Sequence, residues 1–202
     1  MLLKAVQSQR RFEQVAEQIS KLIKKGKLNP GERLPPEREL AKQLEVSRPT
    51  VREAMIALEI SGMVEVRVGS GIYVLNTSSP DLKLRNNTID IGPSPLELIE
   101  ARKEIEGANA ALAAQRIGTD CLEQLEQAIE KMVHDNMTGA DGDREFHLLV
   151  AKATGNSVLE TLTAYLWDQQ QHSPMWTKLI ELIQEKKLHT IVLDDHQCLL
   201  DS

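Results

Sequence analysis

Apolar residues recur at helical spacing along most of this chain, and the pattern changes at one pair of β-prone runs near residue 70. The first helical stretch covers roughly 10–25, with Phe12, Val15 and Ile19 on its apolar face. Two shorter helices are predicted next, the second beginning after an N-cap at Ser47. The β-prone runs 63–67 and 72–75 then form a hairpin. Three helices followed by a hairpin are typical of a winged helix-turn-helix, predicted here over 1–76.

The rest of the chain is predicted to be all helical. Residues 77–94 are rich in turn formers and are interpreted as a linker. Further helices are expected over 95–117, 120–137, 143–154, 157–171, 175–188 and 190–200, with a break at 139–142. Aromatic residues make up only 3% of the chain, so the core is aliphatic and suits helix-on-helix packing. The predicted fold is mainly α, with a helical bundle over 95–202.

Charge divides unevenly between the two halves. Residues 1–76 contain 13 Lys and Arg against 9 Asp and Glu, a net charge of +4, whereas residues 77–202 carry a net charge of −10. This asymmetry indicates that the first half meets a polyanion, although two halves with unrelated surface charge would give the same numbers. The two cysteines are too few for a disulfide framework, and no apolar run is long enough to span a bilayer. We therefore expect a cytoplasmic protein without membrane contact.

The predicted second helix of the pair would enter the major groove of DNA. Ser47, Arg48, Thr50 and Arg52 lie near its start, where side chains reach base edges and phosphates. Arg38 begins the preceding helix and is placed to hold the DNA backbone. Glycine at the hairpin tip lets the wing approach the minor groove. Any one of these arginines, considered alone, could equally be an exposed helix residue with no role in DNA binding. The whole set, in this order along the chain, favours DNA binding.

The motifs PGERLPPERELA at 30–41, VSRPTVREA at 46–54 and GSGIYV at 69–74 closely resemble the GntR family of transcription regulators. The resemblance implies that Arg38, Arg48 and Arg52 contact DNA, assisted by Ser47, Thr50 and Gly69. Pro49 offers no N–H, so one backbone contact of the family pattern is not available at this position.

The second half resembles the FCD ligand domain of the FadR-like branch, through EARKEIE at 100–106, DREFH at 143–147 and TGN at 154–156. PMW at 174–176 and DDHQ at 194–197 look closest to the hexuronate-operon repressors. Asp143 and His147 are four residues apart and share a helix face, so with His196 they could hold a divalent cation such as Zn, Mn or Ni. Arg102 is expected to clamp a carboxylate effector, and Trp176 to line its site.

The resemblance implies a repressor that binds a palindromic operator as a homodimer and is released by a sugar acid such as a hexuronate or fructuronate. Many relatives use one Asp and three His, and the third His would lie beyond Ser202, so the domain is expected to be shortened. Two alternatives remain at this point. One is a shortened regulator that binds DNA without sensing an effector. The other, less favoured, is a metal-dependent hydrolase using Asp143 and His147.

Overall fold

The computed structural model describes residues 10–76, 92–134, 140–183 and 185–201. The chain folds into two compact units, 1–91 and 92–202, each treated below by itself. Most of the predicted linker, residues 77–91, lies outside the described residues. No helix in the described ranges is both long and apolar enough to cross a membrane.

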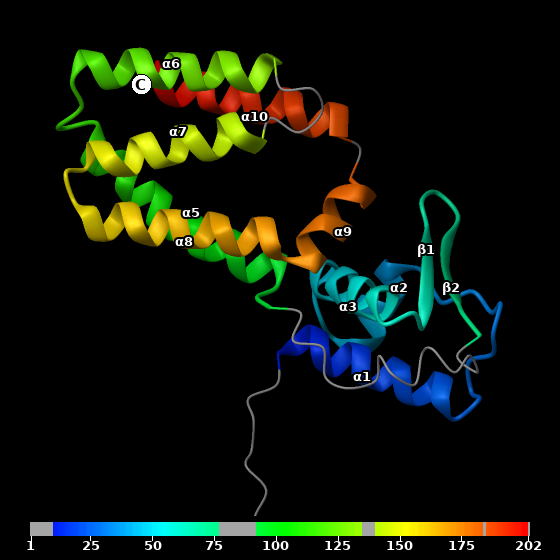
Figure 1. Ribbon diagram of the computed structural model, residues 1–202. Coiled ribbons are helices and arrows are strands. Elements are labelled where there is room, and N and C mark those ends of the chain that lie inside the picture. The colour runs from blue at the N-terminus through cyan, green and yellow to red at the C-terminus, as the bar shows by residue number, and fades with distance from the viewer. Residues whose placement is uncertain (1–9, 77–91, 135–139, 184, 202) are drawn as a thin grey trace, which may run out of the picture. The chain divides into compact units, whose positions relative to one another are not determined.

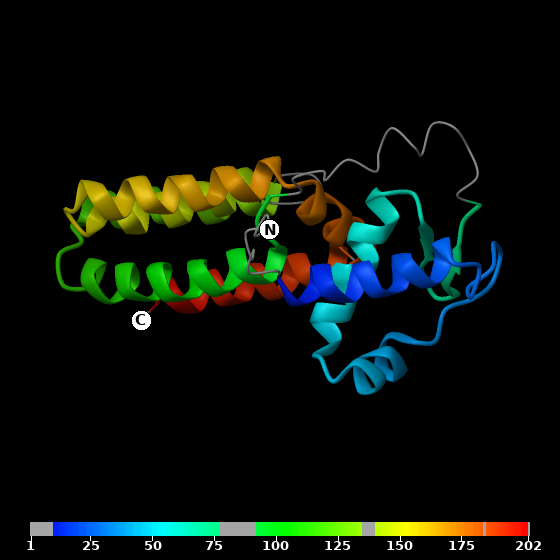
Figure 2. The same cartoon turned by 90° about the horizontal axis from the view of Figure 1, so that it is seen from below.

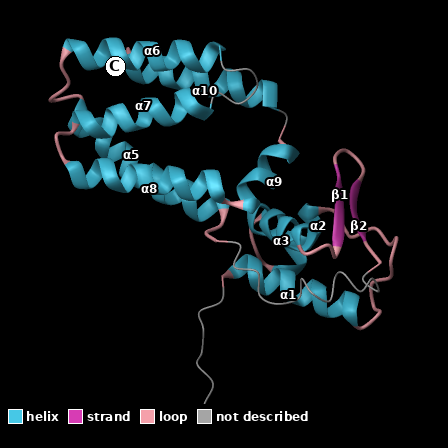
Figure 3. Cartoon of the chain, viewed as in Figure 1, coloured by secondary structure: helices cyan, strands magenta, loops and turns pink. Residues whose placement is uncertain are grey.

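The first unit contains three helices and a hairpin, as predicted (Figures 1 and 3). Its elements are α1 (Arg11–Lys24), α2 (Glu37–Leu44), α3 (Arg48–Ile60), β1 (Val64–Arg67) and β2 (Gly71–Val74). The strands pair antiparallel, with Val64 opposite Val74. Helix α1 packs its buried face on α3, whose Val51, Ala54 and Met55 are almost fully buried. Burial of this aliphatic face holds the three helices together.

The turn between α2 and α3 sets how the second helix is presented. Glu45 adopts a left-handed conformation, with φ 54°, and this residue ends α2. Ser47 then caps α3 by accepting a hydrogen bond from the Thr50 backbone N–H at 3.2 Å, and Pro49 occupies the first turn. Such a cap stabilises a helix by about 1 kcal/mol. The predicted N-cap at Ser47 is confirmed.

The second unit is a bundle of helices, in agreement with the predicted fold class. Its elements are α5 (Pro95–Ala113), α6 (Thr119–His134), α7 (Ala140–Ala153), α8 (Ser157–His172), α9 (Pro174–Leu182) and α10 (Glu185–Leu200). Helix α7 packs against α5, α6 and α8, and α10 packs along α6 (Figure 1). Figure 2 shows the same helices from below. Because α7 has three neighbours, side chains on its different faces reach separate parts of the bundle.

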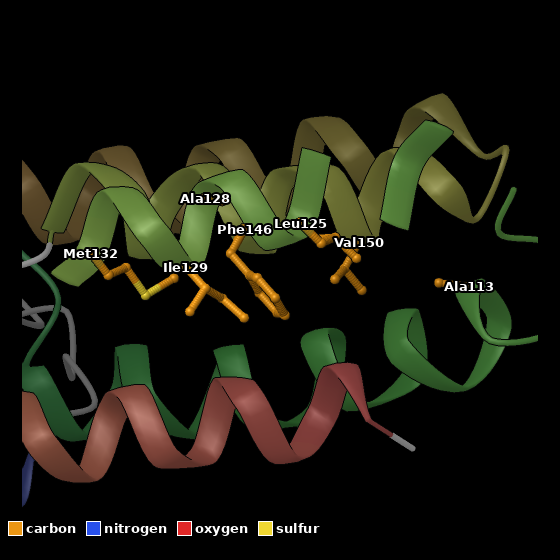
Figure 4. Close-up of a cluster of buried hydrophobic side chains, with 7 residues drawn as sticks. All are labelled: Ala113, Leu125, Ala128, Ile129, Met132, Phe146 and Val150. Carbon is orange, nitrogen blue, oxygen red and sulfur yellow. The ribbon is translucent and has the colours of Figure 1, made fainter. Parts of the chain in front are cut away.

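The main core of this unit lies where α6 and α7 meet (Figure 4). Phe146 of α7 is its largest member and is 1% exposed. Leu193 and Leu200 of α10 close the cluster from the other side. The seven buried side chains are Ala113, Leu125, Ala128, Ile129, Met132, Phe146 and Val150. This core fixes α7 relative to α6 and α10.

Two predicted breaks between helices of this unit are misplaced, and the helix predicted over 95–117 ends at Ala113. Residues 139–142 were expected to break the chain, yet α7 begins at Ala140 and contains Gly142. A Cβ on Gly142 would lie 2.8 Å from the Ala128 carbonyl oxygen of α6, so this glycine permits close helix packing instead of ending a helix. The break expected near 189 lies instead at Ile183, whose backbone is extended. No glycine or proline marks that break, so its position is not evident in the sequence.

Candidate DNA-binding surface and metal centre

Two of the three predicted DNA-contacting arginines are exposed at helix starts. Arg38 lies in the first turn of α2, and Arg48 is the first residue of α3. Neither makes an ion pair with any residue that the structure describes. Both guanidinium groups are therefore available to phosphate or base oxygens, which they could bind with two parallel hydrogen bonds.

Arg52 is held differently, by a bidentate ion pair with Glu37 of α2. Its Nε and Nη2 donate to the two carboxylate oxygens at 3.0 and 2.8 Å. The hydrogen bond to Glu37 raises the pKa of Arg52, against the lowering effect of burial. The pair links α2 to α3 and fixes the Arg52 guanidinium in one orientation. The sequence pattern selected Arg52 but not Glu37, which lies fifteen residues away.

Ser47 and Thr50 form the N-terminal cap of α3. Thr50 is 9% exposed, and its Oγ1 lies 2.7 Å from Ser47 Oγ. This contact orients the capping hydroxyl, whose oxygen accepts the Thr50 backbone N–H. Ser47 itself is exposed. A direct contact of these two residues with DNA stays a prediction.

A further arginine, Arg33, lies beside the glycines of the wing. Gly69 has φ +74° and nothing within 4 Å of an added Cβ, so the tip is open. Gly71 has φ +130°, and a Cβ there would lie 2.5 Å from Arg33 Nε. The exposed Arg33 side chain therefore lies against the start of β2, and Arg33 forms a β-bridge with Tyr73. Sequence reasoning did not select Arg33; its position in the PGERLP motif was the available signal.

The second unit brings together the three predicted metal-ligating side chains. Asp143 and His147 come from α7, and His196 comes from α10. Asp143 Oδ1 lies 3.4 Å from His147 Nε2 and 3.1 Å from His196 Nε2, and the two Nε2 atoms are 3.3 Å apart. We call this set the Asp-His-His cluster.

The outer nitrogen of each imidazole faces an acceptor. His147 Nδ1 lies 3.3 Å from Glu106 Oε2, and His196 Nδ1 lies 2.7 Å from the Val192 carbonyl oxygen. With a cation bound, a proton on each Nδ1 would satisfy both acceptors and leave both Nε2 lone pairs for the cation. Metal-ligating histidines in proteins almost always donate their other ring N–H to such an acceptor.

The cluster fits a divalent cation. Asp143 Oδ1 is buried and has no hydrogen bond of acceptable geometry, and it lies close to the Nε2 atoms of both imidazoles, so three potential ligand atoms converge. Ligand atoms bound to one cation at about 2.0–2.2 Å lie about 2.8–3.6 Å apart in tetrahedral or octahedral geometry. The three separations, 3.1, 3.3 and 3.4 Å, fall within that range.

Electrostatics inside the cluster favour the charged carboxylate. Burial by itself would raise the pKa of Asp143, but its interactions with His147 and His196 outweigh burial and hold that pKa well below its usual range. For His196, burial lowers the pKa and the neighbouring Asp143 raises it, with a net rise. An anionic Asp143 is the form that a cation requires as ligand.

A second layer of polar side chains surrounds the cluster. Glu106 of α5 accepts hydrogen bonds from Arg102 Nε at 2.8 Å and from Trp167 Nε1 at 3.0 Å. Arg102 also donates to Gln170 Oε1 at 2.7 Å, and its guanidinium lies 3.8 Å above the Trp167 ring. The side chains of Arg102 and Glu106 are both 14% exposed. Arg102 is thus beside the cluster, oriented by three neighbours.

Sequence reasoning selected Arg102 but missed Glu106, Trp167 and Gln170. Glu106 follows Arg102 by one helical turn, which was the available signal. The tryptophan whose ring contacts the site is Trp167, 5.4 Å from the His147 ring between centroids. Trp176 lies in the first turn of α9, where its backbone N–H donates to Ser173 Oγ. A role for Trp176 at an effector site stays a prediction.

Comparison with known proteins identifies both units. Residues 11–74 match the model of the bacterial regulatory proteins of the gntR family, and residues 97–202 match the FCD domain. The Uxu operon transcriptional regulator of Escherichia coli K12 is 40% identical over 207 residues, covering 97% of this chain and 79% of that protein. The Exu regulon transcriptional regulator of the same strain is 34% identical, covering 98% and 77%.

A solved structure of a Streptococcus agalactiae GntR protein is 30% identical, covers 94% of this chain and 90% of its own, and superposes with a TM-score of 0.39. These relatives are transcriptional regulators, so the hydrolase alternative is abandoned. The chain belongs to the GntR family of bacterial transcription regulators, with a DNA-binding winged helix-turn-helix followed by an FCD domain.

Proposed function

We propose that this protein is an effector-controlled repressor of a sugar-acid catabolic operon, released from its operator by a hexuronate or a related acid such as fructuronate. The observation that carries the proposal is the Asp-His-His cluster, a partly buried set of three potential cation ligands beside an oriented arginine. The similarity to regulators named for the Uxu operon and the Exu regulon supports a sugar acid as the effector class.

The first unit would read the operator in the bacterial cytoplasm. Arg38 and Arg48 would contact DNA with free guanidinium groups, and Arg52 would do so from its Glu37 pair. Ser47 and Thr50 would hold the start of α3 in the major groove, and the wing tip at Gly69 would approach the minor groove. A homodimer would place two such units on a palindromic operator, because two-fold protein symmetry matches two-fold DNA symmetry.

The second unit would bind the effector. Asp143, His147 and His196 would hold a divalent cation such as Zn, Mn or Ni, which when bound supplies a positive charge that attracts a carboxylate. Arg102 keeps further N–H groups beyond those given to Glu106 and Gln170, so it could bind the same carboxylate. The aromatic ring of Trp167 holds the Arg102 guanidinium in place by a cation–π contact.

Operator binding is tested by fluorescence anisotropy with DNA from the protein's own upstream region. We expect binding whose logarithmic affinity falls linearly with the logarithm of salt concentration, because phosphate contacts release counterions. The triple variant Arg38→Ala, Arg48→Ala and Arg52→Ala should lose operator binding while keeping its fold by circular dichroism. Salt-independent binding, or an unaffected triple variant, would contradict the DNA-binding surface.

Effector sensing is tested by adding fructuronate, glucuronate and galacturonate to the protein–DNA complex, with and without Zn²⁺ or Mn²⁺. At least one acid should weaken operator binding, and Asp143→Asn should remove that response while leaving DNA binding intact. Operator affinity that no acid changes would contradict sensing and favour a regulator that binds DNA without an effector.

A further inference from the structure

A short stretch of chain before α2, residues 31–34, runs alongside strand β2 of the wing (Figure 1). Arg33 forms an antiparallel β-bridge with Tyr73 of β2. Backbone hydrogen bonds to β2 lie on both sides of it: the Leu34 N–H donates at 2.8 Å, and the Glu32 carbonyl oxygen accepts at 2.9 Å. The backbone of Arg33 is therefore fixed to the wing, although Arg33 itself comes from outside the hairpin.

The Arg33 side chain lies on the outer face of the wing. Directly opposed residues of an antiparallel pair place their side chains on the same side of the sheet, so Arg33 shares a face with Tyr73. Arg67 lies on this face too, with its guanidinium 4.5 Å from the centroid of the Tyr73 ring. The opposite face carries the buried Ile72 and Val74. Two arginines are thus on the side of the wing that is turned away from the core.

Gly71 provides the space that the Arg33 side chain occupies. A Cβ at Gly71 would lie 2.5 Å from Arg33 Nε and 3.1 Å from Arg33 Cζ. The guanidinium therefore lies directly on the backbone of β2, where any residue larger than glycine would displace it. A guanidinium held against a strand loses less conformational entropy on binding a ligand than one on a free side chain.

The charge of Arg33 is not paired with a carboxylate in the part of the chain that the structure describes. The two acidic residues nearest to it along the strands have other partners. Glu32 accepts a hydrogen bond from the Asn29 backbone N–H at 2.9 Å, and Glu65 pairs with Arg67 at 2.7 Å. Because Arg33 is also exposed, its N–H groups are available to an anion, and the planar fork suits two phosphate oxygens.

The position of Arg33 favours a backbone phosphate over a base edge. The open wing tip at Gly69 is only two residues from Gly71, on which the guanidinium lies. The minor groove that such a tip approaches is about 6 Å wide and about 7.5 Å deep, with phosphates along both edges. Arg33 comes from the stretch beside β2 and not from the tip, so it can meet a phosphate at the edge of the groove without reaching the bases on its floor.

We propose that Arg33 binds a backbone phosphate of DNA from the outer face of the wing, and that Gly71 is required there because the Arg33 side chain crosses it. Such a contact adds affinity and fixes the position of the wing without reading sequence. The inference rests on the DNA-binding part of the proposed function and assigns a contact to a residue outside the helix pair and the hairpin.

The test is fluorescence anisotropy of Arg33→Ala with operator and with scrambled DNA, between about 50 and 200 mM salt. Affinity for both DNAs should fall by a similar factor of about 10, because one hydrogen-bonded charge contact is lost. The slope of log affinity against log salt should become shallower by about 0.9, the value of one phosphate contact. Arg33→Lys should recover most of the affinity and the slope, since lysine also binds phosphate as a point charge.

Lys21→Ala is the matched control, because it removes one exposed positive charge from the same unit. Lys21 pairs with Glu17 at 2.8 Å and lies on the side of α1 opposite the face buried against α3. Its affinity and salt slope should be those of wild type. Equal losses for Lys21→Ala and Arg33→Ala would show an effect of net charge alone, and an unchanged Arg33→Ala would show no contact; either result overturns the proposal. Loss of operator affinity alone, with scrambled DNA bound normally, would mean that Arg33 reads a base and overturns it too.

A second measurement locates the phosphate. Operator duplexes are made with single methylphosphonates, which carry no charge, at successive positions. At least one substitution that weakens wild-type binding should have no further effect on Arg33→Ala, since the side chain that met that phosphate is already gone. Identical losses at every position in the two proteins overturn the proposal. Circular dichroism checks the fold, and Arg33→Gln, which keeps most of the side-chain length, replaces Arg33→Ala if that variant is misfolded.

These outcomes are separate from those that test sensing. If wild type binds DNA and Arg33→Ala shows the expected losses but no acid changes operator affinity, the Arg33 contact stands and sensing fails. If an acid releases wild type but Arg33→Ala binds both DNAs as wild type does, the Arg33 contact fails and the proposed function stands.

Discussion

At the scale of single residues, the Glu37–Arg52 pair connects the two helices of the DNA-reading motif. Both carboxylate oxygens of Glu37 are used, at 3.0 and 2.8 Å, so the guanidinium plane is fixed before DNA arrives. A fixed guanidinium loses less conformational entropy on binding than a mobile one. The pair therefore couples the orientation of α2 to the direction in which α3 presents its arginine.

We expect Glu37→Gln to lower the ratio of operator to non-specific affinity by about 5- to 150-fold, because a misdirected Arg52 loses base discrimination worth about 1–3 kcal/mol. Glu39→Gln is the matched control, an exposed carboxylate on the same helix that bonds Gln43. Anisotropy titrations with operator and scrambled DNA measure the ratio. An unchanged ratio for Glu37→Gln would show that the pair only stabilises the fold.

Glu106 connects the surrounding polar side chains to the Asp-His-His cluster. It faces His147 Nδ1 at 3.3 Å and also accepts from Arg102 and Trp167. Loss of such an outer carboxylate typically costs 10- to 100-fold in metal affinity. We expect Glu106→Gln to weaken Zn²⁺ or Mn²⁺ binding by about that factor in calorimetry. Glu104→Gln, an exposed glutamate of α5, should bind as wild type; equal affinity of the two variants would contradict the role of Glu106.

At the scale of elements, the contact between α6 and α7 depends on the missing side chain of Gly142. An added Cβ would lie 2.7 Å from Met132 Cγ and 2.8 Å from the Ala128 carbonyl oxygen. Since backbone atoms cannot rotate away, the two helices would have to separate, which disturbs the core around Phe146.

Gly142→Ala should therefore lower the free energy of unfolding by about 1–3 kcal/mol, the usual cost of overpacking. Gly107→Ala is the matched control, because Gly107 lies within α5 with nothing within 4 Å of an added Cβ. That variant should be stabilised by about 1 kcal/mol through helix propensity. Urea denaturation of both variants measures the difference, and a stabilised Gly142→Ala would contradict the packing argument.

Elements with periodic apolar residues and clear caps could be predicted from the sequence. Ser47 and the hairpin glycines marked α3 and the wing, and the spacing of Asp143 and His147 placed both on one helix face. Tertiary contacts could not be predicted. In the sequence, a glycine that ends a helix looks the same as one that lets a neighbouring helix pack closely, as Gly142 does with α6. Nothing local in the sequence indicates that Glu106 and Trp167 lie together beside His147.

At the scale of the whole molecule, the two compact units should respond differently to a bound cation. The Asp-His-His cluster lies entirely within residues 92–202. A ligand that binds only the folded state stabilises it by about 2.7 kcal/mol at a concentration 100 times its dissociation constant. Added Zn²⁺ should thus raise the melting temperature of the FCD unit in calorimetry and leave that of the winged helix unchanged. Asp143→Asn should abolish the shift; a shift that survives would place the cation elsewhere.

Both tryptophans of the sequence, Trp167 and Trp176, lie in the FCD half, and Trp167 is packed between Arg102 and His147. Excitation at 295 nm therefore gives emission from the FCD half alone, even in the intact chain with DNA present. The fluorescence of Trp167 can therefore report the binding of a cation or an effector at the Asp-His-His cluster. It does so in real time and without an added label, while the winged helix is bound to its operator.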